Sequence, residues 1–113
     1  MTSDGFRRLA LSLPEAFEAG HMGHPDFRVG GRIFATLGYP DGRWGMVKLT
    51  PEQQEAFVAA DKGAFAPVEG AWGRRGATSV RLKNAKAKTL RTALTVAWRN
   101  VAPRRLAKDV GVR

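Results

Sequence analysis

With 113 residues and no cysteine, the chain has the size of a single domain and excludes disulfide bonds, thiolate metal ligands and cysteine nucleophiles. No apolar run approaches the roughly 20 residues of a transmembrane helix, and the polar N-terminus lacks a signal-peptide pattern, so we expect a cytoplasmic protein without membrane contact. The net charge of +9 is unevenly distributed, because residues 1–73 hold seven Lys/Arg and nine Asp/Glu, whereas residues 74–113 hold twelve Lys/Arg and one Asp. This surplus predicts a polyanionic partner; charged helix faces that serve only solubility are the simpler alternative.

The N-terminal part predicts one helix and then a meander of three or four antiparallel strands. The helix covers residues 4–13, with Asp4 as its cap and Pro14 as its stop, because apolar residues recur at helical spacing at Phe6, Leu9, Ala10 and Leu13. The extended segments are residues 16–22, 27–29, 32–39 and 43–49. Gly30-Gly31 is typical of a two-residue hairpin, and Pro40-Asp41-Gly42 is typical of a turn.

A second helix is predicted from three agreeing signals at its start. Thr50 is the N-cap, Pro51 occupies the first helical position and Gln53 completes a capping box. We expect this helix to end near Ala60 and to use Phe57 as its core anchor. Residues 61–76 contain four glycines and one proline, which favours a loop.

The C-terminal part predicts a last strand over residues 77–83 and a helix over residues 85–101, which Pro103 ends. Residues 104–113 are expected to form a basic, partly mobile tail. Together the segments predict one α+β domain over residues 1–113, with an antiparallel sheet of about four to five strands flanked by three helices.

Six cations of the C-terminal part fall on a loop, the strand that follows it and the start of the last helix. Because the chain runs directly from one to the next, we expect these side chains to be neighbours that contact the phosphates of DNA. They are Arg74, Arg75, Arg81, Lys83, Lys86 and Lys88. Lys86 and Lys88 lie where cations oppose the helix dipole, and a helix N-terminus attracts anions. Four further candidates are Arg91, Arg99, Arg104 and Arg105.

The sequence holds no helix-turn-helix spacing, zinc-finger pattern or RNA-stacking motif, so contact without base reading is expected. Trp72 beside the arginines could stack on a base, but we expect it in the core or as a lid. The alternative to DNA is an acidic protein partner of the basic surface. DNA cannot be distinguished from RNA at this level.

His21 and His24, with Glu18 and Asp26 nearby, are the only candidate metal ligands. Their spacing matches no metal signature, and strand alternation puts Glu18 and His21 on opposite faces. We therefore expect a structural loop and no metal. Because the chain also lacks a nucleophile elbow, a paired acidic motif and a phosphate-binding loop, we expect no enzymatic activity and no cofactor.

Three segments together resemble a known family. They are the run Gly23–Ala35, the block Gly70–Gly76 with Val80-Arg81-Leu82 after it, and the ending Ala97–Leu106. These segments resemble the signature of the bacterial MmcQ/YjbR family, and the similarity extends over nearly the whole chain.

This resemblance implies a compact antiparallel sheet flanked by helices, akin to the secretion-chaperone architecture. It also implies DNA binding, with no enzymatic activity or cofactor. Many family members carry an aromatic residue where this chain has Ala77, which implies a changed binding surface or a compensated packing difference.

Overall fold

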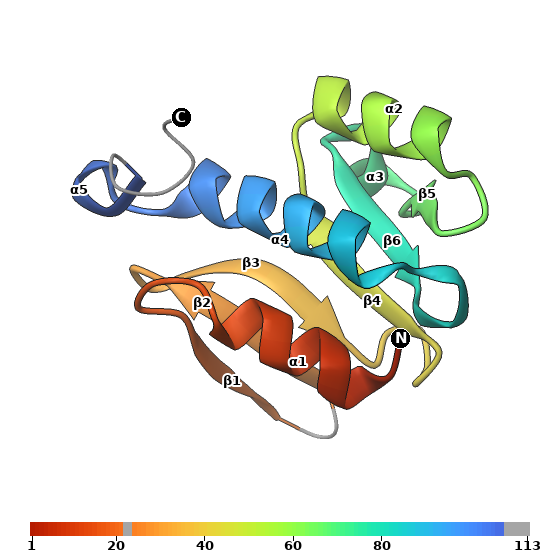
Figure 1. The fold of residues 1–113 in the computed structure, drawn as a ribbon. Coiled ribbons are helices and arrows are strands. Elements are labelled where there is room, and N and C mark those ends of the chain that lie inside the picture. Colours follow the sequence, from red (N-terminus) through yellow and green to blue (C-terminus); the bar gives the residue numbers. More distant parts are fainter. Residues whose placement is uncertain (22–23, 108–113) are drawn as a thin grey trace.

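The computed structural model describes residues 1–21 and 24–107, which form six strands, five α-helices and one 3-10 helix (Figure 1). In chain order they are α1 (Ser3–Leu11), β1 (Phe17–His21), β2 (His24–Val29), β3 (Arg32–Leu37), β4 (Trp44–Lys48), α2 (Pro51–Ala60), β5 (Phe65–Pro67), α3 (Ala71–Arg74), β6 (Ala77–Arg81), η1 (Leu82–Asn84), α4 (Ala87–Val101) and α5 (Arg104–Ala107). The α+β class predicted from the sequence is confirmed.

One antiparallel sheet contains all six strands in the order β1-β2-β3-β4-β6-β5. The strand missing from the sequence-based prediction is β5, which lies in the stretch expected to be a loop, as does the short helix α3. β5 has only three residues, ends on Pro67 and pairs with β6 at the sheet edge. A strand this short has no readable alternation, so its pairing depends on β6 rather than on its own sequence.

The helices α1 and α4 pack together on one face of the sheet. Phe6 of α1 lies directly over Gly45 of β4, where a Cβ atom would come within 2.7 Å of the aromatic ring. On α2, Phe57 is half-buried rather than a fully buried anchor, and its ring centroid lies 5.4 Å from that of Phe65. The core is continuous across these elements, and its largest fully buried side chains are Trp98, Phe6, Phe27, Phe34 and Phe65.

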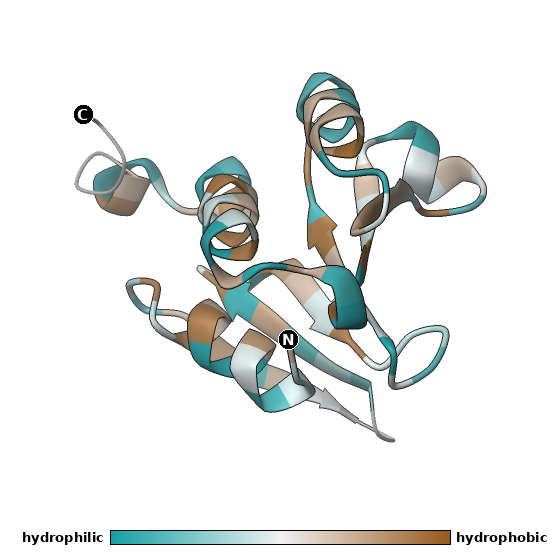
Figure 2. Ribbon diagram, turned by 45° about the vertical axis from the view of Figure 1, so that its right-hand side comes forward, coloured by the Kyte–Doolittle hydropathy of each residue, from teal (hydrophilic) through white to brown (hydrophobic). Residues whose placement is uncertain are grey.

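Apolar and polar residues alternate along the helices in Figure 2, as expected for helices that bury one side against the core. Side chains alternate across a strand, so Trp44 and Met46 point to the sheet face opposite Phe6. Arg81 pairs directly with Trp44 and shares that face. None of the helices in the described ranges is long and apolar enough to cross a membrane.

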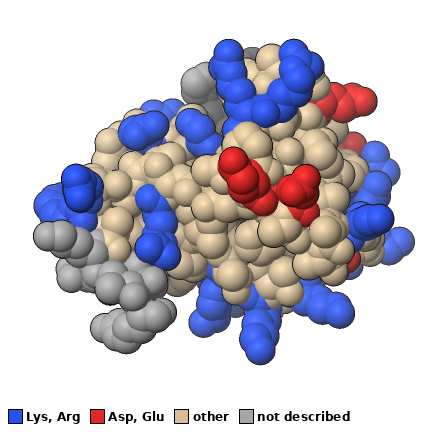
Figure 3. All heavy atoms as spheres, turned by 90° about the horizontal axis from the view of Figure 1, so that it is seen from above, with Lys and Arg blue, Asp and Glu red and all other residues tan. Residues whose placement is uncertain are grey.

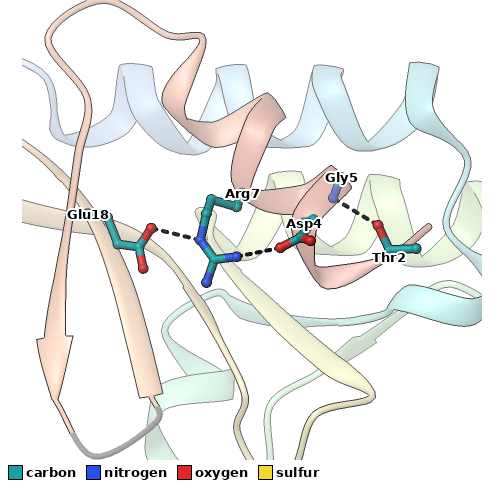
Figure 4. A network of polar contacts seen from close by, with 5 residues as sticks. All are labelled: Thr2, Asp4, Gly5, Arg7 and Glu18. Atoms are coloured by element: carbon teal, nitrogen blue, oxygen red, sulfur yellow. Dashed lines mark hydrogen bonds and ion pairs between the residues drawn. The ribbon is translucent and has the colours of Figure 1, made fainter.

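The helix starts confirm one predicted cap and correct another. In α2, Thr50 Oγ1 accepts from the Gln53 amide at 3.2 Å and Gln53 Oε1 accepts from the Thr50 amide at 2.9 Å, so the capping box is confirmed. In α1 the N-cap is Thr2, whose hydroxyl accepts from Gly5 N, and the prediction of Asp4 is wrong. Asp4 instead binds Arg7, which also binds Glu18 of β1 (Figure 4).

Candidate nucleic-acid interface

Helix α4 is held against the sheet by an apolar stripe of six buried residues, which are Leu90, Ala93, Leu94, Ala97, Trp98 and Val101. The indole of Trp98 is fully buried and donates from Nε1 to the carbonyl of Pro14 at 3.0 Å. The stripe fixes the rotation of the helix about its axis, so the residues on the other side must face solvent.

The solvent-facing side of α4 carries cations. Lys88 and Arg99 are eleven residues apart, which is three helical turns and about 16 Å along the axis, and both are exposed. Arg91 is also exposed, at the edge of this side. No Asp or Glu occurs between Glu69 and Asp109, so α4 contains no acidic neighbour for them.

The N-terminus of α4 adds a second positive feature. Lys86 is the N-cap and provides no side-chain hydrogen bond, so the amides of the first turn have no side-chain cap. Lys88 lies in the first turn and Lys83 lies in η1 just before it, and all three lysines are exposed. The helix begins at Ala87 rather than at the predicted residue 85.

The structure divides the six cations that were expected to be neighbours. Arg74 and Arg75 precede β6, whereas Lys83 and Lys86 follow it, and β6 is five residues long, or about 16 Å. Arg81 lies at the end of the strand with its guanidinium 4.4 Å from the centroid of the Trp44 ring, on the sheet face opposite α1. The expected single neighbourhood is therefore wrong for the two arginines at the start of β6.

The predicted tail begins with the helix α5 rather than with irregular chain, and residues 108–113 lie outside the described residues. Arg105 in α5 donates to Glu15 at 3.2 and 3.3 Å, and this carboxylate raises the pKa of Arg105. Arg104 is exposed and forms no ion pair within the described part of the chain. Of Arg104 and Arg105, only Arg104 is therefore free of an ion pair within the described residues and available to a binding partner.

The view from the top of Figure 1 shows how the charges are distributed on that side of the molecule. Lys and Arg side chains form separate groups around its rim, with acidic side chains near its centre (Figure 3). Helix α2 contributes the exposed Glu52 and Glu55. We therefore expect a polyanion to bind the surface of α4, which has no acidic residue, and not the entire side shown in Figure 3, which includes the acidic residues of α2.

The histidine loop offers no metal ligand set among the described residues. Glu18 and Asp26, the two carboxylates in question, bind Arg7 and Arg28 at 2.8 Å. His24 Nδ1 lies 3.0 Å from the carbonyl oxygen of Gly38. The side chain of His21 lies outside what the structure describes.

Trp72 corrects another expectation. It is 67% exposed on α3, so the prediction that it packs in the core is wrong. Ala77 is buried at the first position of β6.

Sequence reasoning missed a group at the other end of β6, where Trp44 and Lys62 lie with Arg81 around one small hollow. The three residues come from β4, from the segment between α2 and β5, and from β6. Lys62 belongs to residues 1–73, where nine acidic residues outnumber seven basic ones, so the charge count gave no signal for it. The backbone bond from Arg81 N to Ala64 O, at 2.8 Å, holds two of these segments together.

Comparisons with known proteins agree with this architecture. The structure is similar to the crystal structure of Deinococcus radiodurans protein DR2400, which carries a DUF419 domain, with a TM-score of 0.75 and 21% sequence identity over 99% of this chain and 89% of that one. A search of curated proteins finds no significant match. The sequence model of the YjbR family matches residues 11–100. Because that match covers most of the chain, and the motifs predicted it independently, the chain belongs to the YjbR family.

Proposed function

We propose that the domain binds DNA through its phosphates, with the outer side of α4 and its uncapped N-terminus as the contact surface. Its cations are Lys83, Lys86, Lys88, Arg91, Arg99 and Arg104. The observation that carries the proposal is that these exposed cations form no ion pair within residues 1–21 and 24–107, and that α4 contains no acid. We expect the protein to act in the cytoplasm.

Like charges held on one helix repel one another, and a polyanion relieves this repulsion while releasing its own counterions. The separation of Lys88 and Arg99, about 16 Å, equals the rise of about five base pairs along the axis of a DNA duplex. The hydroxyls of Thr92 and Thr95, between them, donate back to the carbonyls of Lys88 and Arg91 at 3.2 and 2.8 Å. These two hydroxyls are therefore not free to read bases, and the remaining donors belong to Lys and Arg, which we expect to contact phosphates with little sequence preference.

The test is the affinity for duplex DNA as a function of salt concentration. Six phosphate contacts give a slope of about −5 in a plot of log K against log salt. Duplexes of equal length and different sequence are expected to bind within a few-fold of one another. A flat salt dependence, or no binding in low salt, contradicts the proposal.

An acidic protein is the second candidate partner, and one observation favours it. Trp72 is exposed on the same short segment as Arg74 and Arg75, away from the α4 surface. Interfaces between proteins are enriched in tryptophan and arginine. Pull-down with and without nuclease distinguishes the candidates, because a partner retained after nuclease treatment, and lost in Trp72→Ala, supports a protein partner.

A further inference from the structure

The sheet face opposite α1 contains a hollow of about 80 Å³ at the end of β4 and β6. Large side chains of Trp44, Arg81 and Lys62 line it together with the small residues Gly63, Ala64 and Ala66. Phe65 of β5 also borders the hollow, but it pairs with Val80, which alternates with Arg81 along β6, so its side chain points to the other face of the sheet. The small residues beside Trp44, Arg81 and Lys62 therefore leave a depression on this face.

The guanidinium of Arg81 is already oriented in this hollow. It lies 4.4 Å from the centroid of the Trp44 ring, and the two residues are direct partners across β4 and β6. Stacking on an aromatic face fixes the plane of a guanidinium and leaves its N–H donors in that plane. Within the described part of the chain, neither Arg81 nor Lys62 makes a side-chain hydrogen bond or ion pair, so these donors have no protein acceptor.

Hydrogen bonds to the backbone keep the lining segments in place. Arg81 N donates to Ala64 O at 2.8 Å, and Asn84 Nδ2 donates to Gly63 O at 2.7 Å. Leu82 N donates to Arg43 O at 3.1 Å, next to Trp44. The hollow therefore has a preformed shape, which lowers the entropic cost of binding a ligand.

The charge of the lining selects an anion. It holds two cations and no acid. The nearby carboxylate of Asp41 is bound by Arg43 at 2.8 Å, and Asp61, which precedes Lys62, is not part of the lining. A phosphate monoester carries about −1.5 to −2 charges at pH 7 and matches two cations, whereas a carboxylate carries one.

The volume restricts the size of that anion. About 80 Å³ is far below the roughly 300–1,000 Å³ of sites for drug-sized ligands. A tetrahedral oxyanion fits this space, and a whole nucleoside does not.

We propose that this hollow binds one phosphate group, held by the in-plane donors of Arg81 and by the ammonium of Lys62, with Trp44 as the residue that positions Arg81. The phosphate comes either from inorganic phosphate or from the terminal phosphate of a nucleotide. The site does not depend on the α4 surface, so either proposal can fail without the other.

The experiment is a titration of the full chain with inorganic phosphate, followed by the NMR signals of the Trp44 indole Nε1–H and Arg81 Nε–H. We expect saturable shifts at these groups and much weaker ones with acetate. Arg81→Gln and Lys62→Gln are each expected to weaken phosphate binding at least tenfold. Arg32→Gln, which removes an exposed cation at the β2–β3 hairpin, is the matched control and keeps wild-type affinity.

Two further arms complete the test. Lys62 is exposed, so Lys62→Gln keeps the fold and remains informative even if Arg81→Gln disturbs β6. Adenosine monophosphate that binds as tightly as inorganic phosphate supports a site for the phosphate group alone, and tighter binding identifies the nucleotide as its source. Shifts that do not saturate, an equal response to acetate, or equal weakening by Arg32→Gln overturn the proposal.

Discussion

Three of the five arginines before residue 74 are ion-paired, whereas neither arginine of α4 has an ion pair within the described residues. Before residue 74, Arg7, Arg28 and Arg43 each bind a carboxylate at 2.8 Å. On α4, Arg91 and Arg99 are exposed and have no ion pair within the described residues. The basic surplus is therefore more than a count, because the cations of α4 have no acidic partner within residues 1–21 and 24–107.

The arginines differ in whether an acidic residue lies close to them in the sequence. Asp26 and Arg28, and likewise Asp41 and Arg43, are two positions apart on an extended or turn segment. On a helix, the equivalent partner of a cation stands three or four positions away. α4 has no acid at any position, so no rotamer of Arg99 can find one on its own helix.

The largest expected effect is on the free energy of unfolding, and it tests whether α4 shares one hydrophobic core with the N-terminal part of the chain. Trp98→Ala should destabilise the domain by about 3–5 kcal/mol, because it removes a fully buried side chain and its bond to Pro14. Chemical denaturation measures this change. Trp72→Ala is the control at an exposed tryptophan, with an expected change within about 0.5 kcal/mol. Equal losses for both would mean that α4 is not anchored as described.

The next largest effect is on DNA binding, and it compares the exposed cations of α4 with those of the N-terminal part. Lys88→Gln with Arg99→Gln should reduce the salt slope of DNA binding by about 2, because each phosphate contact contributes about 0.9. Arg8→Gln with Arg32→Gln changes the net charge equally at two exposed arginines of the other part and should leave the slope nearly unchanged. The measurement is binding of one duplex over a range of salt concentrations. The same loss in both pairs would assign binding to net charge alone.

A smaller effect separates bound from unbound arginines. Arg28→Gln should lower the thermal midpoint measurably, because Asp26 is 9% exposed and loses the donors that reach it at 2.8 and 3.1 Å. Arg99→Gln should change stability by no more than about 0.5 kcal/mol. Calorimetry on both variants compares them directly. If Arg99→Gln is as destabilising as Arg28→Gln, the α4 cation has a structural role.

The smallest effect concerns pH. Hydrogen bonds from the Arg43 side chain and amide lower the pKa of Asp41 to about 2. A pKa that is lower in the folded state stabilises the fold above the ordinary Asp value of about 3.9, and this contribution disappears as the pH falls towards about 2. Carboxyl NMR titration should show the low value, and Arg43→Gln should return the pKa towards the ordinary range. A normal value in the wild type would exclude the ion pair in solution.

Much of the fold could be read directly from local patterns. The capping box at Thr50, the hairpin at Gly30-Gly31 and the apolar stripe of α4 each involve residues within a few positions of one another, and all three are present in the structure. The family motifs also predicted the YjbR membership that the comparison established. The cation candidates came from a count along the chain, which cannot separate Arg74 from Lys83 across the length of β6.

The order of most helices and strands and the absence of acids from α4 can therefore be predicted from the sequence, because caps, periodicity and charge blocks are local properties. Three features become visible only in the folded chain: β5 joins the sheet edge, Trp72 is exposed, and Lys62, Trp44 and Arg81 line one hollow. The strand pairing and the hollow depend on contacts between segments about 10 to 40 residues apart. Local sequence patterns do not predict which strands will be neighbours in the sheet. For this reason, cations that follow one another in the sequence lie at separate sites in the folded domain.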